Sequence, residues 1–320
     1  MKAVITGASG FIGGALTRRL LSEGWSVTAL GRRPVIGTDF LAWDLGALVP
    51  SLTGADAVFH VAARVGDWGR REDFERENVD STRRLLEACE VARVPAFVFT
   101  GSPSAFLGDA DVEGADESLV EPTAHLSEYG RSKAIADRLV RAHRGVTRTT
   151  VLRPHAVIGP GERHLHRLIS AMSTLGCVLQ IGDDVRLSIT SLETCVNAHV
   201  RAAERLLEGQ GGGDAFFIAD TPAVSLRELL SSEIERRAGR TPLTIRLPRE
   251  PLMALARFAE WFHTPFPRWA PIINRYRVAM LSRSHTFDVS RMRDVLGVSP
   301  RPSHLLLGRS FGARAVARSL

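Results

Sequence analysis

Short apolar runs alternate with amphipathic stretches through the first half of the chain. The apolar runs lie at 2–6, 25–30, 40–43, 57–61, 96–100 and 149–152. Segments with helical spacing of apolar residues lie between several of them, at about 11–23, 71–91 and 127–144. Strands that alternate with helices in this way predict an α/β fold built on a doubly wound parallel sheet.

The pattern changes after Pro160. We expect a helix near 165–174, short strands near 178–181 and 186–189, a helix at 192–207 and a strand at 215–219, with helices dominating beyond Thr221. The predicted organisation is therefore a first domain over 1–158, to which 192–219 returns, and a smaller, mostly helical C-terminal domain over 159–320 that we expect to bind the substrate.

A glycine motif follows the first predicted strand. Gly7, Gly10 and Gly13 are spaced as in a dinucleotide-binding loop: a strand precedes them and a helix follows. The first glycine permits a tight turn, the second lets the backbone approach a pyrophosphate, and the third allows close packing of helix on strand. The predicted fold is thus of the Rossmann type, and the cofactor contacts expected from this loop are Gly7, Ser9, Gly10, Phe11, Ile12 and Gly13.

Residues after the next strands bear on the choice of cofactor. The second strand ends in Gly31-Arg32-Arg33, where NAD-selective sites place a carboxylate for the ribose 2′-hydroxyl. Arginine suits a 2′-phosphate, so NADP(H) is favoured and NAD(H) is possible. Asp44 and Leu45 are expected beside the adenine, and Ala62 and Ala63 against the cofactor backbone.

Tyr129 and Lys133 form the strongest candidate for chemistry. The chain has two tyrosines, and its two lysines are Lys2 and Lys133. One of each lies at positions i and i+4 of a predicted helix and so on one helix face. Ser102, after the fifth strand, is expected at the cofactor crevice with Ser104 as its fallback, because ligands bind beyond the carboxyl ends of parallel strands. Taken alone, the tyrosine–lysine pair is equally consistent with an ordinary surface pair.

Composition excludes several other classes. The net charge is +6, but the arginines are spread along the 320 residues, which gives no nucleic-acid-binding arm and is compatible with an anionic cofactor or substrate. Three separated cysteines argue for a reducing compartment and against a structural metal. No apolar run approaches a membrane span, and the glycine-rich N-terminus reads as strand, turn and helix rather than a signal peptide. A cytoplasmic protein is expected.

Three further features leave alternatives open. His60 is expected to be a packed histidine at the end of a strand rather than a base. Trp68 either lines a substrate pocket or caps the sheet edge. The apolar residues of 252–281 form a helical core stripe, the lining of an apolar pocket, or a contact with a second copy or a membrane surface, and periodicity alone does not separate these. A homodimer and peripheral membrane contact are both compatible with this stretch.

The order Gly7-x-x-Gly10-x-x-Gly13, Ser102 and Tyr129-x-x-x-Lys133 resembles the extended short-chain dehydrogenase/reductase family. The stretches 62–69, 153–160 and 285–290 are similar to its 3β-hydroxysteroid dehydrogenase-like branch, and nearest to 2-alkyl-3-oxoalkanoate reductases. Two positions depart from the pattern: Gly101 stands in the middle of the strand-five motif, and 191–194 lacks the usual acidic pair.

The resemblance implies an NAD(P)(H)-dependent oxidoreductase that interconverts a ketone and a secondary alcohol on an apolar, 3-oxoacyl-like or steroid-like substrate. Tyr129 would be the general acid/base, with its pKa lowered by Lys133 and the oxidised nicotinamide. Ser102 would bond the substrate oxygen, and Lys133 the nicotinamide ribose. The cofactor contacts implied further along the chain are Tyr129, Lys133, Pro154 and His155.

Two other functions stay open on the residues alone. One is a nucleotide-sugar ketoreductase or epimerase of the same extended family. The other is a non-catalytic dinucleotide-binding regulator, which would need the glycine loop but not the tyrosine–lysine pair.

Overall fold

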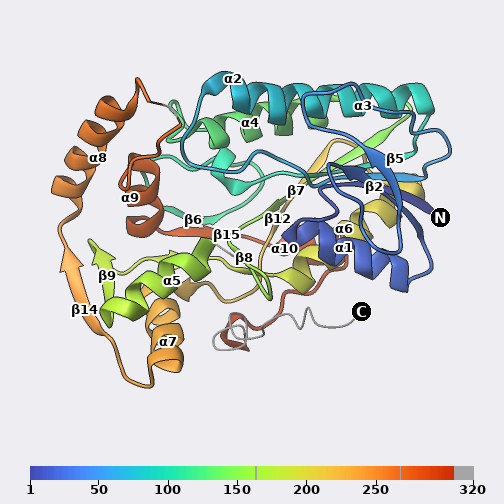
Figure 1. Cartoon of the computed structure of the whole chain (residues 1–320). Helices are drawn as coiled ribbons and strands as arrows, with labels where there is room; N and C mark the ends of the chain where they lie inside the picture. Colours follow the sequence, from blue (N-terminus) through green and yellow to red (C-terminus); the bar gives the residue numbers. More distant parts are fainter. Residues whose placement is uncertain (163, 267, 306–320) are drawn as a thin grey trace.

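The computed structural model describes residues 1–162, 164–266 and 268–305. Its centre is a seven-stranded parallel sheet in the order β12-β7-β5-β4-β1-β2-β3 (Figure 1). The strands are β1 (Lys2–Thr6), β2 (Ser26–Gly31), β3 (Asp39–Ala42), β4 (Ala57–His60), β5 (Ala96–Thr100), β7 (Arg148–Pro154) and β12 (Asp214–Ile218). The parallel Rossmann-type sheet predicted from the sequence is confirmed.

Helices cover both faces of this sheet. On one face α3 (Ser81–Ala92) and α4 (Glu128–Ala142) bury Leu85 and Val140 against the strands. On the other face α1 (Phe11–Ser22) and α6 (Leu192–Leu207) bury Leu16 and Val200. Apart from the edge strand β3, the strands between the layers are largely buried, which explains why they read as continuous apolar runs.

The order of the strands creates a switch point at β1. From β1 the chain crosses first to β2 and β3 on one side and then to β4, β5, β7 and β12 on the other. Such a reversal leaves a crevice at the carboxyl ends of the central strands, where ligands bind in open α/β sheets. The loops that follow β1, β2 and β4 meet at this edge.

The remaining elements form a second layer beside the carboxyl edge. It includes a four-stranded sheet in the order β13-β10-β15-β6 and the pairs β14-β9 and β11-β8. The strands are β6 (Val112–Ala115), β8 (Val157–Ile158), β9 (Cys177–Ile181), β10 (Arg186–Leu187), β11 (Thr190–Ser191), β13 (Val224–Ser225), β14 (Leu243–Leu247) and β15 (His285–Phe287). The helices are α5 (His164–Leu175), α7 (Leu226–Ala238), α8 (Arg249–His263), α9 (Arg275–Ser282) and α10 (Ser290–Asp294), with short 3₁₀ turns at Pro103–Ala105 and Ser303–Leu305.

Short strands were predicted near 178–181 and 186–189 and correspond to β9 and β10, but the small sheets that they join were not predicted. No strand was predicted between 100 and 127, yet β6 lies there and pairs with β15, about 170 positions further along the chain. Strands as short as the two residues of β8, β11 and β13 carry too little alternation to be recognised from sequence. They form because a distant partner offers backbone hydrogen bonds.

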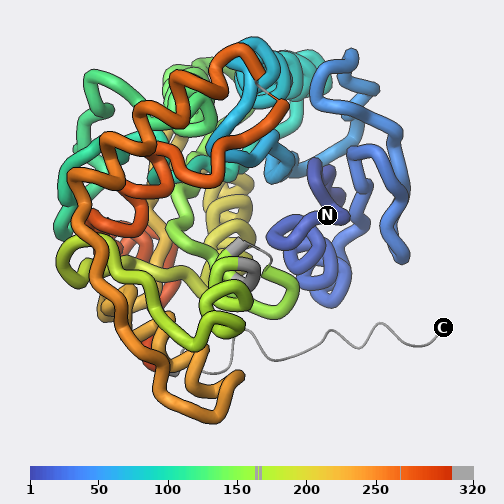
Figure 2. Tube along the Cα trace, turned by 60° about the vertical axis from the view of Figure 1, so that its left-hand side comes forward, coloured from blue at the N-terminus to red at the C-terminus, as the bar shows by residue number. Residues whose placement is uncertain are grey.

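The apolar stretch 252–281 is not a core stripe, so that interpretation was wrong. Met253, Ala256 and Val278 are buried, but most of the large apolar side chains are exposed. The exposed ones are Leu255, Phe258, Trp261, Phe262, Phe266, Trp269 and Ile272. Figure 2 shows this segment, in orange, as an outer layer distant from the N-terminal strands in blue.

No helix in the described part of the chain is long and apolar enough to cross a membrane. Cys89, Cys177 and Cys195 are buried free thiols.

Candidate active site and cofactor cleft

The glycine loop connects β1 to α1 in a tight turn. Gly7 has φ +70°, and its carbonyl accepts a hydrogen bond from the Gly10 amide at 2.8 Å. A Cβ on Gly13 would lie 2.2 Å from the Gly7 carbonyl oxygen, so only glycine allows the helix to start this close to the strand. The first turn of α1 carries no capping side chain and no acidic residue. Its free N–H groups fit a pyrophosphate.

The end of β4 is fixed to the end of β1 by Thr6. The Thr6 hydroxyl accepts hydrogen bonds from the Val61 and Ala62 amides, each at 3.0 Å, and bonds His60 Nδ1 at 2.8 Å. The other ring nitrogen of His60 bonds Thr82. Burial lowers the pKa of His60 to about 3, with the Lys133 charge acting in the same direction. His60 is thus a neutral, packed histidine that holds the loop at Ala62.

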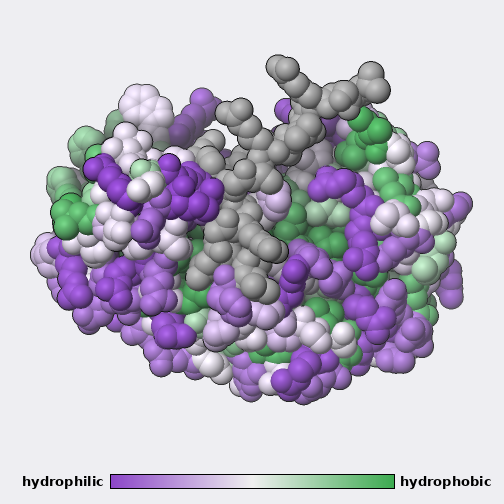
Figure 3. Space-filling model, turned by 90° about the horizontal axis from the view of Figure 1, so that it is seen from below, coloured by the Kyte–Doolittle hydropathy of each residue, from purple (hydrophilic) through white to green (hydrophobic). Residues whose placement is uncertain are grey.

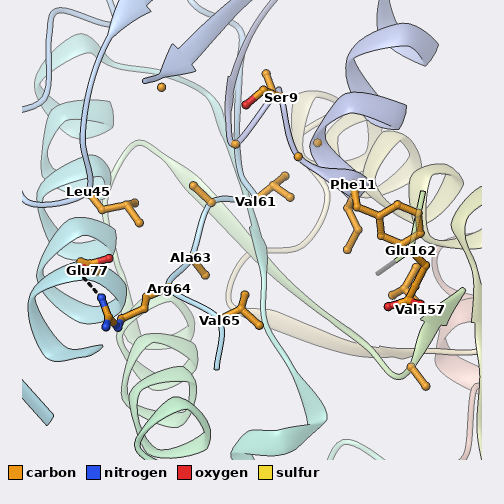
Figure 4. Close-up of a pocket in the computed structure, with 18 of the residues that line it drawn as sticks. Ser9, Phe11, Leu45, Val61, Ala63, Arg64, Val65, Glu77, Val157 and Glu162 are labelled. Atoms are coloured by element: carbon orange, nitrogen blue, oxygen red, sulfur yellow. Dashed lines mark hydrogen bonds and ion pairs between the residues drawn. The ribbon is translucent and has the colours of Figure 1, made fainter. Parts of the chain in front are cut away.

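A cavity of about 1060 Å³ lies over this edge of the sheet. Figure 4 shows Val61, Ala63 and Val65 on one wall and Phe11 and Val157 on another, with Arg64 paired to Glu77 at 3.0 Å. The expected cofactor residues that line it are Gly7, Ser9, Gly10, Phe11, Ile12, Gly13, Arg32, Asp44, Leu45, Ala62 and Ala63, and Trp68 lines it too. These positions are dispersed in sequence and the fold gathers them around one space.

Four expected cofactor residues do not line this cavity: Tyr129, Lys133, Pro154 and His155. Pro154 ends β7 in the sheet interior. His155 packs on Phe287, with its Nδ1 2.5 Å from the Ser188 carbonyl oxygen, and burial lowers its pKa. In this structure His155 therefore joins the sheet to the second layer.

Arg32 and Arg33 follow β2 and border the cavity from its exposed side. Neither side chain has a hydrogen bond or an ion pair with any residue in the described ranges. Two unpaired cations therefore stand where the ribose end of a dinucleotide would lie.

Both tyrosines of the chain meet beside the strand-five hydroxyls. Tyr129, in the first turn of α4, is hydrogen-bonded to Ser102. The Tyr276 hydroxyl, from α9, lies 3.2 Å from Ser104 Oγ, and Ser104 N donates to Ser102 Oγ at 3.2 Å. The structure thus brings Ser102 and Tyr129 together as expected. Tyr276 was missed, and its scarcity in the sequence was the one signal that could have drawn attention to it.

The acidity of Tyr129 differs from the expectation. Burial raises the pKa of Tyr129 to about 12, the neighbouring Tyr276 acts in the same direction, and the hydrogen bond to Ser102 opposes the change. The predicted lowering of the Tyr129 pKa by Lys133 is not seen, because the Lys133 ammonium points toward the sheet. Its Nζ donates a hydrogen bond to the Thr100 carbonyl at 2.7 Å and lies 4.6 Å from the centre of the Phe99 ring. At neutral pH Tyr129 is a protonated phenol and a potential proton donor.

Lys133 is a fully enclosed cation. Burial lowers the pKa of Lys133 to about 7, and the Asp137 carboxylate opposes that change. Asp137, one turn further along α4, itself forms a buried two-bond ion pair with Arg153 at 2.7 and 2.8 Å. Burial therefore makes Lys133 lose its proton more readily than an exposed lysine would.

Two further glycines set the spacing at this site. A Cβ on Gly101 would lie 2.9 Å from Val151 Cγ1, which explains why this chain departs from the usual strand-five motif. A Cβ on Gly130 would lie 2.5 Å from the Ser104 carbonyl oxygen. Gly130 thus lets the turn that carries Tyr129 pack directly on the turn that carries Ser102.

We predict that Gly130→Ala lowers kcat by about tenfold or more and destabilises the protein by about 1–3 kcal/mol, since overpacking a close contact outweighs the better helix propensity of alanine. Steady-state kinetics with thermal unfolding measures both. Gly46→Ala, where a Cβ would meet only ordinary contacts at 3.6 Å, is the control. A fully active Gly130→Ala variant would show that this approach of helix and turn is not needed.

Asn78 connects the cleft to the tyrosine helix and was also missed. The predicted helix 71–91 is split into α2 (Arg71–Phe74), a π-helical turn (Glu75–Asp80) and α3. Within that turn Asn78 accepts from the Arg64 amide at 2.7 Å and donates to Ser132 Oγ at 2.9 Å. A π-turn is invisible to a periodicity of 3.6 residues.

The parallel sheet, the glycine loop and the cleft above it define an extended short-chain dehydrogenase/reductase, a class of nucleotide-binding oxidoreductases. Residues 3–210 match the NAD dependent epimerase/dehydratase family, and the chain belongs to that family.

Several similar reductases and dehydrogenases align with most of the chain. A 2-alkyl-3-oxoalkanoate reductase of Shewanella oneidensis is 31% identical over 93% of this chain and 82% of its own length. Short-chain dehydrogenase/reductase family 42E member 1 of Xenopus laevis is 30% identical over 93% and 84%. A decarboxylating sterol-4-alpha-carboxylate 3-dehydrogenase of Schizosaccharomyces pombe is 29% identical over 94% and 93%. The predicted resemblance to the 3β-hydroxysteroid dehydrogenase-like branch is confirmed.

Solved structures agree in fold. MoeE5 in complex with UDP-glucose and NAD is 29% identical and superposes with a TM-score of 0.72 over 94% of both chains. The structure of gox2253, at 23% identity, reaches 0.77 over 96% of both and shows the fold alone. The protein is therefore an NAD(P)-dependent enzyme of the extended short-chain dehydrogenase/reductase class.

Proposed function

We propose that this enzyme reduces a ketone on an apolar, 3-oxoacyl-like or steroid-like substrate to a secondary alcohol, and catalyses the reverse oxidation. The observation that carries the proposal is the composition of the cavity beyond the glycine loop. Its walls there are nearly all aliphatic: Val157, Ile158, Leu165, Leu168, Leu187, Ile189, Leu226, Leu229 and Leu281. Such a lining favours a hydrocarbon over a polar sugar.

Helix α9 connects this aliphatic space to the hydroxyl cluster. Leu281 lines the cavity and Tyr276 lies at Ser104, five positions earlier on the same helix. At 1.5 Å per residue the two are about 8 Å apart along the helix axis. The same helix therefore borders both the aliphatic space and the hydroxyl cluster beside Tyr129.

We assign the roles as follows. A bound nicotinamide supplies or accepts the hydride. In reduction Tyr129 donates its phenolic proton to the ketone oxygen, and in oxidation the phenolate takes it back. Ser102 holds the substrate oxygen while negative charge develops on it. Lys133, one helical turn from Tyr129, would bond the nicotinamide ribose hydroxyls.

Relatives also support a second candidate. MoeE5 is seen with UDP-glucose and with UDP-glucuronic acid, so a nucleotide-sugar ketoreductase or epimerase remains the alternative. This alternative predicts turnover of a keto-sugar nucleotide and little change in KM when the aliphatic residues of the cavity are substituted. A non-catalytic regulator predicts dinucleotide binding without turnover of any ketone.

The deciding experiment measures NADPH and NADH oxidation with 3-oxoacyl, 3-ketosteroid and keto-sugar nucleotide substrates. We expect turnover with the apolar ketones. Leu168→Asn and Leu226→Asn, which replace apolar side chains of the cavity wall with polar ones, should raise the KM for these ketones without a matching loss of kcat. Turnover restricted to the sugar nucleotides would refute the proposal.

We further propose a preference for NADP(H), supported by the two unpaired arginines at the 2′ end of the cleft. The prediction is that Arg32→Ala raises the KM for NADPH about tenfold, and that for NADH by less than twofold, because a charge-assisted phosphate contact is lost. Comparing kcat/KM for the two cofactors in parent and variant measures it. Arg18→Ala, an exposed arginine on α1, is the control. A parent enzyme that prefers NADH would contradict this assignment.

A further inference from the structure

The exposed face of α8 and the segment that follows it concentrate the aromatic surface of the protein. Trp261 and Trp269 are 71% and 73% exposed, and Ile272 is 95% exposed. Of the six exposed aromatic side chains in the described part of the chain, five lie here: Phe258, Trp261, Phe262, Phe266 and Trp269. We call Leu255, these five residues and Ile272 the aromatic face. Monomeric soluble proteins rarely leave so many large apolar groups together in water.

The aromatic rings lie on one another at the surface instead of entering the core. Phe258 and Trp261 are 5.9 Å apart between ring centres, and Phe266 stacks on Trp269 at 6.2 Å. The opposite face of α8 is the one that enters the core, through Met253 and Ala256. Figure 3, which views the molecule from below, shows a few apolar residues within a mostly hydrophilic surface at its left-hand edge.

The charges around the aromatic face are positive. Arg257 and Arg268 have no hydrogen bond or ion pair with a described residue. The one carboxylate between positions 255 and 272 is that of Glu260, and it accepts hydrogen bonds from the side chain and the backbone amide of Arg275. A second copy of this face would bring the same excess of positive charge to the contact, whereas an anionic surface complements the free arginines.

The geometry of α8 suits a helix that lies on a membrane surface rather than one that crosses the membrane. Helix α8 has 15 residues, about 22 Å, and its inner face is committed to the protein. Aromatic rings beside arginines are the composition of helices that lie in the plane of the bilayer interface, with rings among the acyl chains and cations at the headgroups.

We propose that the aromatic face docks this enzyme onto an anionic lipid bilayer. Helix α8 packs on α9, and α9 carries Tyr276, Arg277 and Leu281 to the site. Arg277 forms an ion pair with Asp67 of the cleft loop. Docking would therefore hold the helix that borders the aliphatic cavity next to the bilayer. Bilayer binding itself does not depend on which substrate the enzyme uses.

The test is co-sedimentation of the full chain with vesicles of phosphatidylcholine alone and of phosphatidylcholine mixed with phosphatidylglycerol. We expect binding to the mixed vesicles at least tenfold tighter than to phosphatidylcholine. The variant Trp261→Ser/Trp269→Ser should lose at least tenfold on the mixed vesicles, and Arg257→Gln/Arg268→Gln should lose the preference for anionic lipid. Ile36→Ser/Leu48→Ser removes exposed apolar residues elsewhere and should bind like the parent.

Unchanged thermal unfolding and NADPH binding of each variant establish that it is folded. No binding of the parent to either vesicle would overturn the proposal. It would equally be overturned by a parent dimer in sedimentation velocity that Trp261→Ser/Trp269→Ser converts to a monomer, because a second copy would then cover this face.

Discussion

Tyr129→Phe is expected to lower kcat for ketone reduction by about 10²–10⁴-fold, the range that a positioned general acid contributes. The dissociation constant of NADPH should stay close to that of the parent, because the ring remains and only the hydroxyl at Ser102 is lost. Single-turnover reduction together with NADPH fluorescence titration separates the two quantities. The raised pKa of Tyr129 keeps the proton available for reduction throughout the neutral range.

The matched control is Tyr276→Phe, because the chain has no other tyrosine. It removes a hydroxyl that touches Ser104 and leaves Tyr129 intact. We expect most of the turnover to remain, with a change mainly in KM. Normal turnover in Tyr129→Phe would remove Tyr129 from the mechanism, and a larger loss in Tyr276→Phe would move the proton donor to the other phenol.

Lys133→Met is expected to lower kcat about 10²-fold or more and to weaken NADPH binding, while changing how stability depends on pH. In the parent, burial lowers the pKa of Lys133 to about 7, from about 10.4 in an unfolded chain. Between these two pH values the unfolded state binds the proton and the folded state does not. The contribution of Lys133 therefore makes the parent more stable as the pH rises from about 7 to 10.

The methionine variant lacks this contribution. The stability difference, variant minus parent, should accordingly fall as pH rises through that window. The lost bond to the Thr100 carbonyl shifts the difference by an amount that does not depend on pH. Unfolding by denaturant in the cofactor-free protein at several pH values gives the slope.

Lys2→Met supplies the control, since Lys2 is the other lysine of the chain and is exposed. Its stability should follow the parent at every pH. A difference in stability between the parent and Lys133→Met that stays constant from pH 7 to 10 would contradict this prediction. It would show that burial does not lower the pKa of Lys133 in the folded protein.

The site divides into parts that sequence predicted and parts that it did not. The glycine loop was predicted because its three glycines serve backbone geometry that only glycine satisfies. Tyr276 and Asn78 were missed because each reaches the site through a contact that no local pattern encodes: one across 172 positions to Ser104, the other through a π-helical turn. The pKa of Tyr129 was expected to fall because Lys133 is adjacent in helical spacing, and the structure turns that lysine to Thr100 instead.

The sequence by itself determined the parallel sheet, the glycine loop and the face that Tyr129 shares with Lys133. These are local properties, set by apolar runs, by glycine spacing and by the 3.6-residue turn. Only the tertiary structure decided which hydroxyls meet at Tyr129, that the cleft continues into an aliphatic space, and that the aromatic residues of α8 face outward. The physical reason is that an apolar stripe on a helix is the same in sequence whether the rest of the chain, a ligand or a membrane covers it.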